Sequence, residues 1–213
     1  WPAEFRGNLL VGNVMTSRIN RDRVEWRGSS SVGHEIEDLL KCDDPWFRPV
    51  DLQFGPDSCL YVADFYNRII GHYEVPLDHP GRDRERGRIW RIVPPGVKDR
   101  SQALPESVPD LIAELAADNP TRRALALNEL SDRTDPKISR ELKRVVRGKL
   151  KSGTSGDRKH LLVNGLWLLQ RGGALGEGIH LQALADPDES VRLHATRIAA
   201  GMDRWSSVIK AAV

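Results

Sequence analysis

The chain has 213 residues, of which 39% are hydrophobic and 29% are charged, as expected for a folded protein. Its 32 Lys and Arg residues nearly balance 30 Asp and Glu, so no strong positive field indicates a nucleic-acid partner. No stretch approaches the roughly 20 apolar residues of a membrane-spanning helix. A chain of this length forms one large domain or two small ones.

Short strands joined by turns are predicted before Pro94. Apolar side chains alternate or run together in residues 8–14, 50–54, 59–64 and 88–93, as is typical of strands. Residues 55–58, Gly-Pro-Asp-Ser, provide a turn. Strands of this kind build the blades of a β-propeller, although a β-sandwich uses the same pieces.

The pattern becomes helical after a linker, which we place at residues 96–106 because Pro94-Pro95-Gly96 ends the last strand. Helices are predicted over 107–117, 120–131, 136–150, 157–170, 177–185, 188–201 and 204–213. Asp, Asn and Pro at the starts of several of these segments suit helix N-termini.

One helical segment recurs within the second half. The sequence from Asn119 matches the sequence from Asp188, an offset of 69 residues, with Arg123 aligned to Arg192. This offset is about two units of a helical-hairpin repeat. We expect both arginines to tie their helix to the acid of the neighbouring turn, and Trp167 to pack in the repeat core.

Two parts of the chain resemble known families. Residues 184–195 resemble a HEAT repeat. Residues 44–51, 55–57, 60–67, 69–72 and 87–92 resemble the propeller of a family of bacterial membrane-bound dehydrogenases, best known from Planctomycetes and their relatives. In that family a propeller similar to those of quinoprotein sugar dehydrogenases precedes HEAT-like repeats and commonly a haem c domain.

The resemblance implies a mixed fold with all-β and all-α parts. Residues 1–95 would be the C-terminal part of a β-propeller, fewer than two blades, and residues 107–213 a truncated HEAT-like helical repeat array. We therefore expect a fragment of a longer protein. The implied location is exported, either periplasmic or associated with the cell envelope.

The resemblance also implies a function for the full-length protein. It would oxidise a sugar or alcohol with pyrroloquinoline quinone (PQQ) and calcium, and pass electrons to haem c in a domain absent here; the fragment alone would be inactive. The alternative is a non-catalytic scaffold whose propeller and HEAT surfaces bind a glycan or a protein partner.

The connection after the strand at 59–64 concentrates acids, imidazoles and guanidinium groups, as a site loop does. A histidine there can accept the proton of a substrate hydroxyl, arginines can hold an anionic cofactor, and aspartates can bind calcium. The candidates are His72 and His79 for catalysis, Arg48, Arg68 and Arg82 for the cofactor, and Asp64, Asp78 and Asp83 for calcium.

A structural role is the alternative for the same residues. In it Asp64 and Asn67 cap backbone turns, residues 82–88 form a solvated rim, and His72 packs against Tyr73. The two cysteines, Cys42 and Cys59, leave a similar choice: they form a disulfide, which an exported protein permits, or they are two separate thiols.

Overall fold

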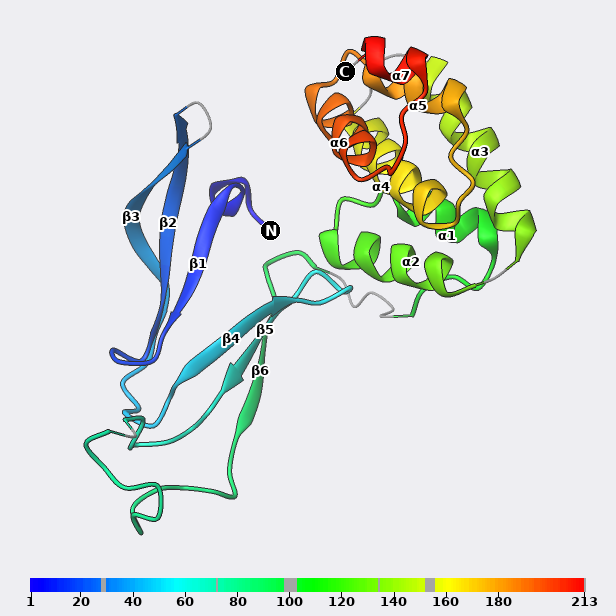
Figure 1. Ribbon diagram of the computed structural model, residues 1–213. Coiled ribbons are helices and arrows are strands. Elements are labelled where there is room, and N and C mark those ends of the chain that lie inside the picture. Colours follow the sequence, from blue (N-terminus) through cyan, green and yellow to red (C-terminus); the bar gives the residue numbers. More distant parts are fainter. Residues whose placement is uncertain (28–29, 72, 98–102, 134, 152–155, 213) are drawn as a thin grey trace. The chain divides into compact units, whose positions relative to one another are not determined.

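The computed structural model describes residues 1–27, 30–71, 73–97, 103–133, 135–151 and 156–212 (Figure 1). The chain divides into two compact units, residues 1–102 and 103–213, so the division falls within the expected linker. Strands occupy the first unit, here called the β unit, and helices occupy the second, the helical unit. The predicted mixture of β and α structure is confirmed.

The β unit holds two antiparallel three-stranded sheets, each with its strands in chain order. The first contains β1 (Asn8–Asn13), β2 (Arg18–Arg27) and β3 (Ser30–Lys41), and the second contains β4 (Pro49–Phe54), β5 (Leu60–Asp64) and β6 (Arg88–Ile92). Within the described residues the strands form no closed barrel and no complete propeller. The four predicted strands are present, whereas β2 and β3 are not predicted from the sequence.

β2 lacks a clear alternation because a bulge interrupts its register and most of its side chains are polar. Ile19 is fully buried, but the strand register shifts between Ile19 and Arg21, and half-buried Arg21 lies over the Phe5 ring at 4.6 Å from its centroid. A guanidinium covered by an aromatic ring takes the place of an apolar side chain. The strand is therefore held by tertiary contacts that its own residue pattern does not show.

The two sheets of the β unit pack face to face. Buried Ile19 from the first sheet joins Leu60 and Val62 from the second, together with Phe47. Gly12 of β1 permits a close approach to β4, because a Cβ there would lie 2.3 Å from the Pro49 carbonyl oxygen. Any larger residue would push the two sheets apart.

Cys42 and Cys59 belong to this unit and form no disulfide with each other; Cys42 is half-buried and Cys59 is buried. The structure thus has the second of the two arrangements that the sequence left open.

Asp57 is a fully buried carboxylate beneath β5 and β6. It accepts hydrogen bonds from the Cys59 N–H at 3.1 Å, the Tyr61 hydroxyl at 2.9 Å and the Arg91 Nε at 2.9 Å. Burial by itself would raise the Asp57 pKa, but these donors outweigh it and lower the pKa below its ordinary value. Asp57 therefore stabilises the fold as an anion.

The Asp57 pKa predicts a pH dependence. Because the pKa is about 3.9 in an unfolded chain and lower in the folded one, the stabilisation is complete above that value and is lost as the pH falls through the folded pKa. Asp57→Asn should therefore reduce the free energy of unfolding at neutral pH, with a difference that shrinks below about pH 4. Urea unfolding followed by Trp fluorescence measures it. Asp51→Asn, at an exposed position of β4, is the control, and a difference independent of pH would contradict the assignment.

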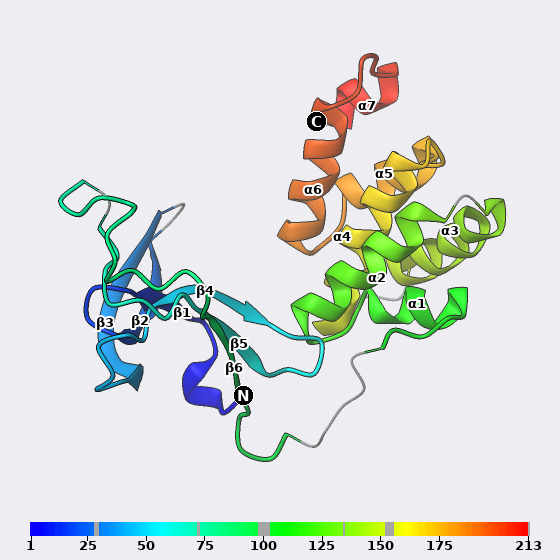
Figure 2. The same ribbon diagram turned by 90° about the horizontal axis from the view of Figure 1, so that it is seen from below.

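The helical unit contains seven helices in its described residues, in the places predicted. They are α1 (Val108–Glu114), α2 (Pro120–Asp132), α3 (Pro136–Lys151), α4 (Gly156–Arg171), α5 (Glu177–Leu184), α6 (Glu189–Ala200) and α7 (Ser207–Ala212). α4 contacts both α2 and α6, while α3 contacts α1 and α5, so consecutive helices form stacked hairpins (Figure 2). No helix in the described ranges is long and apolar enough to cross a bilayer.

The internal sequence repeat is matched by a repeat of helix capping. The Asn119 side chain accepts a hydrogen bond from the Thr121 N–H at 2.8 Å, at the start of α2. The Asp188 side chain accepts one from the Ser190 N–H, also at 2.8 Å, at the start of α6. The offset that relates the two sequences therefore also relates their helix-capping hydrogen bonds.

The two aligned arginines also make matching contacts. Arg123 donates to the Ala117 carbonyl at 2.6 Å, and Arg192 donates to the Asp186 carbonyl at 2.7 Å; each also reaches the next carbonyl along the chain. Both arginines thus tie their helix to the preceding turn, as expected, but through backbone carbonyls that include those of Asp118 and Asp186 and not through the carboxylates.

Trp167 departs from its predicted place in the core. Leu166 and Leu169 are buried, but Trp167 is 38% exposed and its Nε1 donates to the Nδ1 of His194 at 3.0 Å. The indole lies on the surface between α4 and α6, because the buried stripe of α4 passes through its neighbours and not through position 167.

Candidate functional site

The connection between β5 and β6, residues 65–87, begins at a buried carboxylate. Asp64 accepts hydrogen bonds from the backbone N–H groups of Arg48 at 2.8 Å and Tyr66 at 2.9 Å. Its second oxygen accepts from the Trp90 Nε1 at 3.0 Å. These are N–H donors, which oppose a bound cation, so Asp64 has the role of a backbone cap.

Asn67 and Asp83 fix the two ends of the connection to each other. Asn67 accepts from the Ile69 N–H at 3.1 Å and donates to the Asp83 carbonyl at 2.7 Å. The Asp83 carboxylate accepts from the backbone N–H groups of Glu85 and Arg86, at 3.0 Å each, and pairs with the Arg86 side chain. The Glu85 N–H has the largest effect on the Asp83 pKa, which is lowered despite the opposing effect of burial.

Arg48 is buried and binds segments that are distant from one another in the sequence. Its Nε donates to the Asn67 carbonyl at 2.9 Å, and its terminal nitrogens donate to the carbonyls of Val14 and Arg68. The guanidinium is thus surrounded by backbone oxygens. Its predicted role as a cofactor ligand does not fit this arrangement, since its donors are used within the fold.

Arg82 has the same role inside the connection. Its Nε donates to the Pro76 carbonyl at 3.0 Å, and its terminal nitrogens donate to the carbonyls of Ile69, Gly71 and Val75. The Arg82 guanidinium therefore binds four backbone carbonyls of the same loop. Arg82, like Arg48, does not fit the role of binding an anionic cofactor.

The structure does not bring the predicted calcium ligands together. The described residues contain no group of three or more His, Cys, Asp or Glu side chains able to hold a metal, so Asp64, Asp78 and Asp83 form no calcium site among them. The reason is visible at Asp64 and Asp83, whose oxygens are already bonded to N–H groups. The residues present do not fit the ion.

Of the two histidines predicted to be catalytic, the structure describes one. His79 lies on the exposed part of the connection, and its Nδ1 accepts a hydrogen bond from the Gly81 N–H at 3.0 Å. His72 lies outside the described residues, and so does its expected contact with Tyr73.

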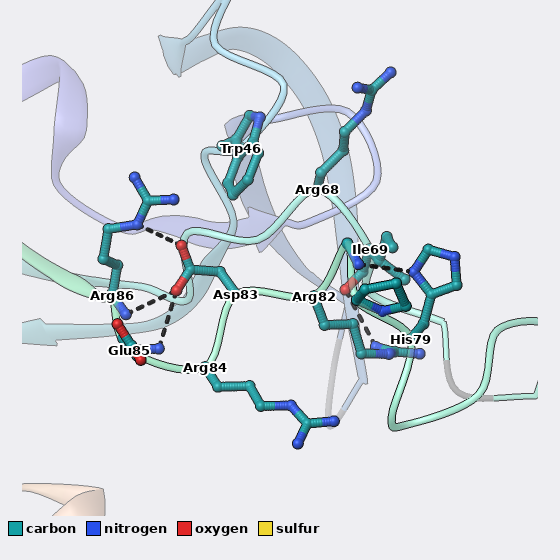
Figure 3. A pocket seen from close by; sticks show the side chains of 11 residues that line it. Trp46, Arg68, Ile69, His79, Arg82, Asp83, Arg84, Glu85 and Arg86 are labelled. Carbon is teal, nitrogen blue, oxygen red and sulfur yellow. Dashed lines mark hydrogen bonds and ion pairs between the residues drawn. The ribbon is translucent and has the colours of Figure 1, made fainter.

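An open pocket of about 990 Å³ lies on the connection (Figure 3). Trp46, residues 68–69 and residues 79–86 line it. Arg68 is exposed, and its side chain projects to the same side as Trp46 and Arg86, whereas Arg84 extends to the opposite side. Four of the candidates from the sequence line this pocket: Arg68, His79, Arg82 and Asp83. Arg82 and Asp83 are bonded to the loop backbone, which leaves Arg68 and His79 as the exposed candidates.

Beside the pocket lies an aromatic–arginine cluster, formed by Trp46, Tyr66, Arg86, Arg88 and Trp90. The Trp46 and Tyr66 ring centroids are 5.4 Å apart. The Arg86 guanidinium lies 5.4 Å from the first ring and 5.6 Å from the second. Arg88 lies 3.4 Å from the Tyr66 ring and 5.6 Å from Trp90. Cation–π contacts of this kind fix both the rings and the charges.

The cluster was not predicted from the sequence. Its members come from the segment before β4, the end of β5 and the start of β6, so no local spacing marks them. Arg86 and Arg88 were expected only within a solvated rim. The one available signal was the unusual concentration of Trp, Tyr and Arg in segments that the turns around β5 bring together.

The fold and pocket define a chain with a β unit that carries the site and a helical unit of stacked hairpins. Residues 1–96 match a family described as a domain of unknown function (DUF7133). No curated protein and no solved structure matches the chain.

Proposed function

We propose that this chain is a non-catalytic binding scaffold, in which the pocket beside Trp46 takes a glycan. In this proposal the β unit contributes two neighbouring blade-like sheets of a propeller, and the helical unit is a HEAT-like array. Two successive three-stranded meanders packed face to face support the first assignment. The repeated caps and arginine contacts of α2 and α6 support the second.

One observation carries the functional proposal: the groups expected to do chemistry hold the loop together. Arg48 and Arg82 bind carbonyls, and Asp64 binds N–H groups. The side chains that remain at the pocket surface include an indole and guanidinium groups, beside His79 and Glu85. Rings pack against the apolar faces of sugars while guanidinium groups donate to their oxygens, so these groups are suited to binding rather than to proton transfer.

A glycan panel tests the proposal. Isothermal titration calorimetry of the 213-residue chain against neutral and acidic oligosaccharides should find at least one ligand, and Trp46→Ala should weaken its binding about tenfold or more. Trp26→Ala is the matched control, because Trp26 is an exposed indole of the same unit that does not line the pocket. If no oligosaccharide binds, or if both variants lose affinity equally, the scaffold proposal is wrong.

A second proposal is a PQQ-dependent dehydrogenase of which this chain forms a part, in an exported protein. The observation that favours it is that Arg68 and His79 line one pocket. The other predicted ligands do not fit, as described for Arg48 and Arg82. A full-length protein supplied with PQQ and calcium should reduce a dye when sugars or alcohols are added, and absence of turnover across a broad panel would contradict this proposal.

A further inference from the structure

We infer that the pocket selects acidic glycans, meaning sugars that carry carboxylate or sulfate groups. This inference rests on the proposed glycan-binding function and names its ligand class. It is carried by two features on the same side of the connection: an excess of guanidinium groups lining the pocket and the aromatic–arginine cluster beside it.

Positive charge predominates at the pocket. Four arginines line it against two carboxylates, Asp83 and Glu85; Arg82 and Arg84 donate to loop carbonyls, which leaves Arg68 and Arg86 on the side of Trp46. One of the two, Asp83, already accepts from two backbone N–H groups and pairs with Arg86. Arg68 is exposed, and none of the interactions of the described residues involves its guanidinium. An anion entering from this side therefore meets unsatisfied donors rather than repulsion.

Arg86 is held in a fixed orientation before any ligand arrives. Asp83 binds its Nε, and the rings of Trp46 and Tyr66 lie beside its guanidinium plane. Its terminal nitrogens point away from Asp83 (Figure 3). A guanidinium fixed in this way loses little conformational entropy on binding, and its two terminal N–H groups match the paired oxygens of a carboxylate or sulfate.

The charge distribution favours a glycan over a nucleic acid. Proteins that bind a duplex neutralise many phosphates along an extended basic face. Here residues 1–95 contain 13 basic and 15 acidic side chains, so this part of the chain carries no net positive charge that would attract a duplex. A pocket with a half-buried ring and a few guanidinium groups suits one or two acidic sugar units.

The test compares two ligands that differ only in charge. Calorimetry with the 213-residue chain would use a galacturonic acid trisaccharide and its carboxyl-reduced neutral counterpart. We expect the acidic sugar to bind at least about tenfold more tightly, with an affinity that falls as salt is added. A short DNA duplex and PQQ serve as competing anions.

Substitutions locate the binding. Arg68→Gln and Arg86→Gln should each weaken binding of the acidic trisaccharide about tenfold. Arg23→Gln removes the same charge from an exposed position of β2 outside the pocket and should change the affinity less than about twofold. Arg68→Gln keeps the test decisive if Arg86→Gln disturbs the loop.

The outcomes separate this inference from the proposed function. If the neutral trisaccharide binds as tightly and Trp46→Ala weakens both, the glycan scaffold stands and the acid selectivity is wrong. If neither trisaccharide binds, the acid selectivity is wrong, and the wider glycan panel decides the scaffold. Tighter binding of DNA or PQQ, or equal effects of Arg23→Gln and Arg68→Gln, would overturn the inference.

Discussion

Replacing Arg158 with Met should lower the free energy of unfolding of the helical unit by about 3–5 kcal/mol. Arg158 and Asp186 are both buried and form a bidentate pair, with Nη1 to Oδ1 at 3.0 Å and a second contact between Nη2 and Oδ2. Arg158 also donates to the Lys149 carbonyl at 2.8 Å. Without the guanidinium, the Asp186 carboxylate keeps only the Asp188 N–H as a partner in a buried position.

Urea unfolding followed by far-ultraviolet circular dichroism measures this effect. Arg171→Met, at an exposed position at the end of the same helix, is the control and should change stability by no more than about 0.5 kcal/mol. Adding Asp186→Asn to Arg158→Met should recover part of the loss, since it removes the unpaired charge and keeps an acceptor for Asp188. Equal effects of Arg158→Met and Arg171→Met would refute the structural role.

Arg48→Met should destabilise the β unit by about 3 kcal/mol or more. The substitution leaves the carbonyls of Val14, Asn67 and Arg68 without their shared donor, and each buried unpaired acceptor costs about 1–3 kcal/mol. Trp fluorescence during urea unfolding reports on this unit, which contains four of the six Trp residues.

Arg68→Met is the matched control for Arg48→Met, because it removes the same charge from an exposed side chain and leaves the Arg68 carbonyl in place. It should leave the unfolding curve nearly unchanged. If the two variants unfold alike, Arg48 does not hold these segments together as the structure indicates.

The helices were predictable because their signals are local. Asn119 and Asp188 each stand at a helix start, and the apolar positions between caps follow one period, so the sequence contains both the ends and the buried face. β2 was missed for the opposite reason: a bulge interrupts its alternation, and Arg21 is covered by Phe5, which lies 16 residues away.

The sequence indicated where the candidate site lies but not what its charged side chains do. The density of charged residues pointed to the connection, and a pocket lies on it. What the charges do depends on partners distant in sequence: Arg48 reaches Val14, 34 residues earlier. Asp57 looked like an ordinary turn residue because Arg91, its ion-pair partner, is 34 residues further on. No spacing rule reveals such contacts.

Arg82 holds the backbone of the connection together, whereas Arg68 lines the pocket with an exposed side chain. Hydrogen exchange of the backbone amides in residues 65–71 and 73–87 tests it most directly, since Ile69, Gly81 and Glu85 donate hydrogen bonds within this loop. The account predicts that Arg82→Met accelerates exchange there and that Arg68→Met does not. Unchanged protection in Arg82→Met would contradict the account.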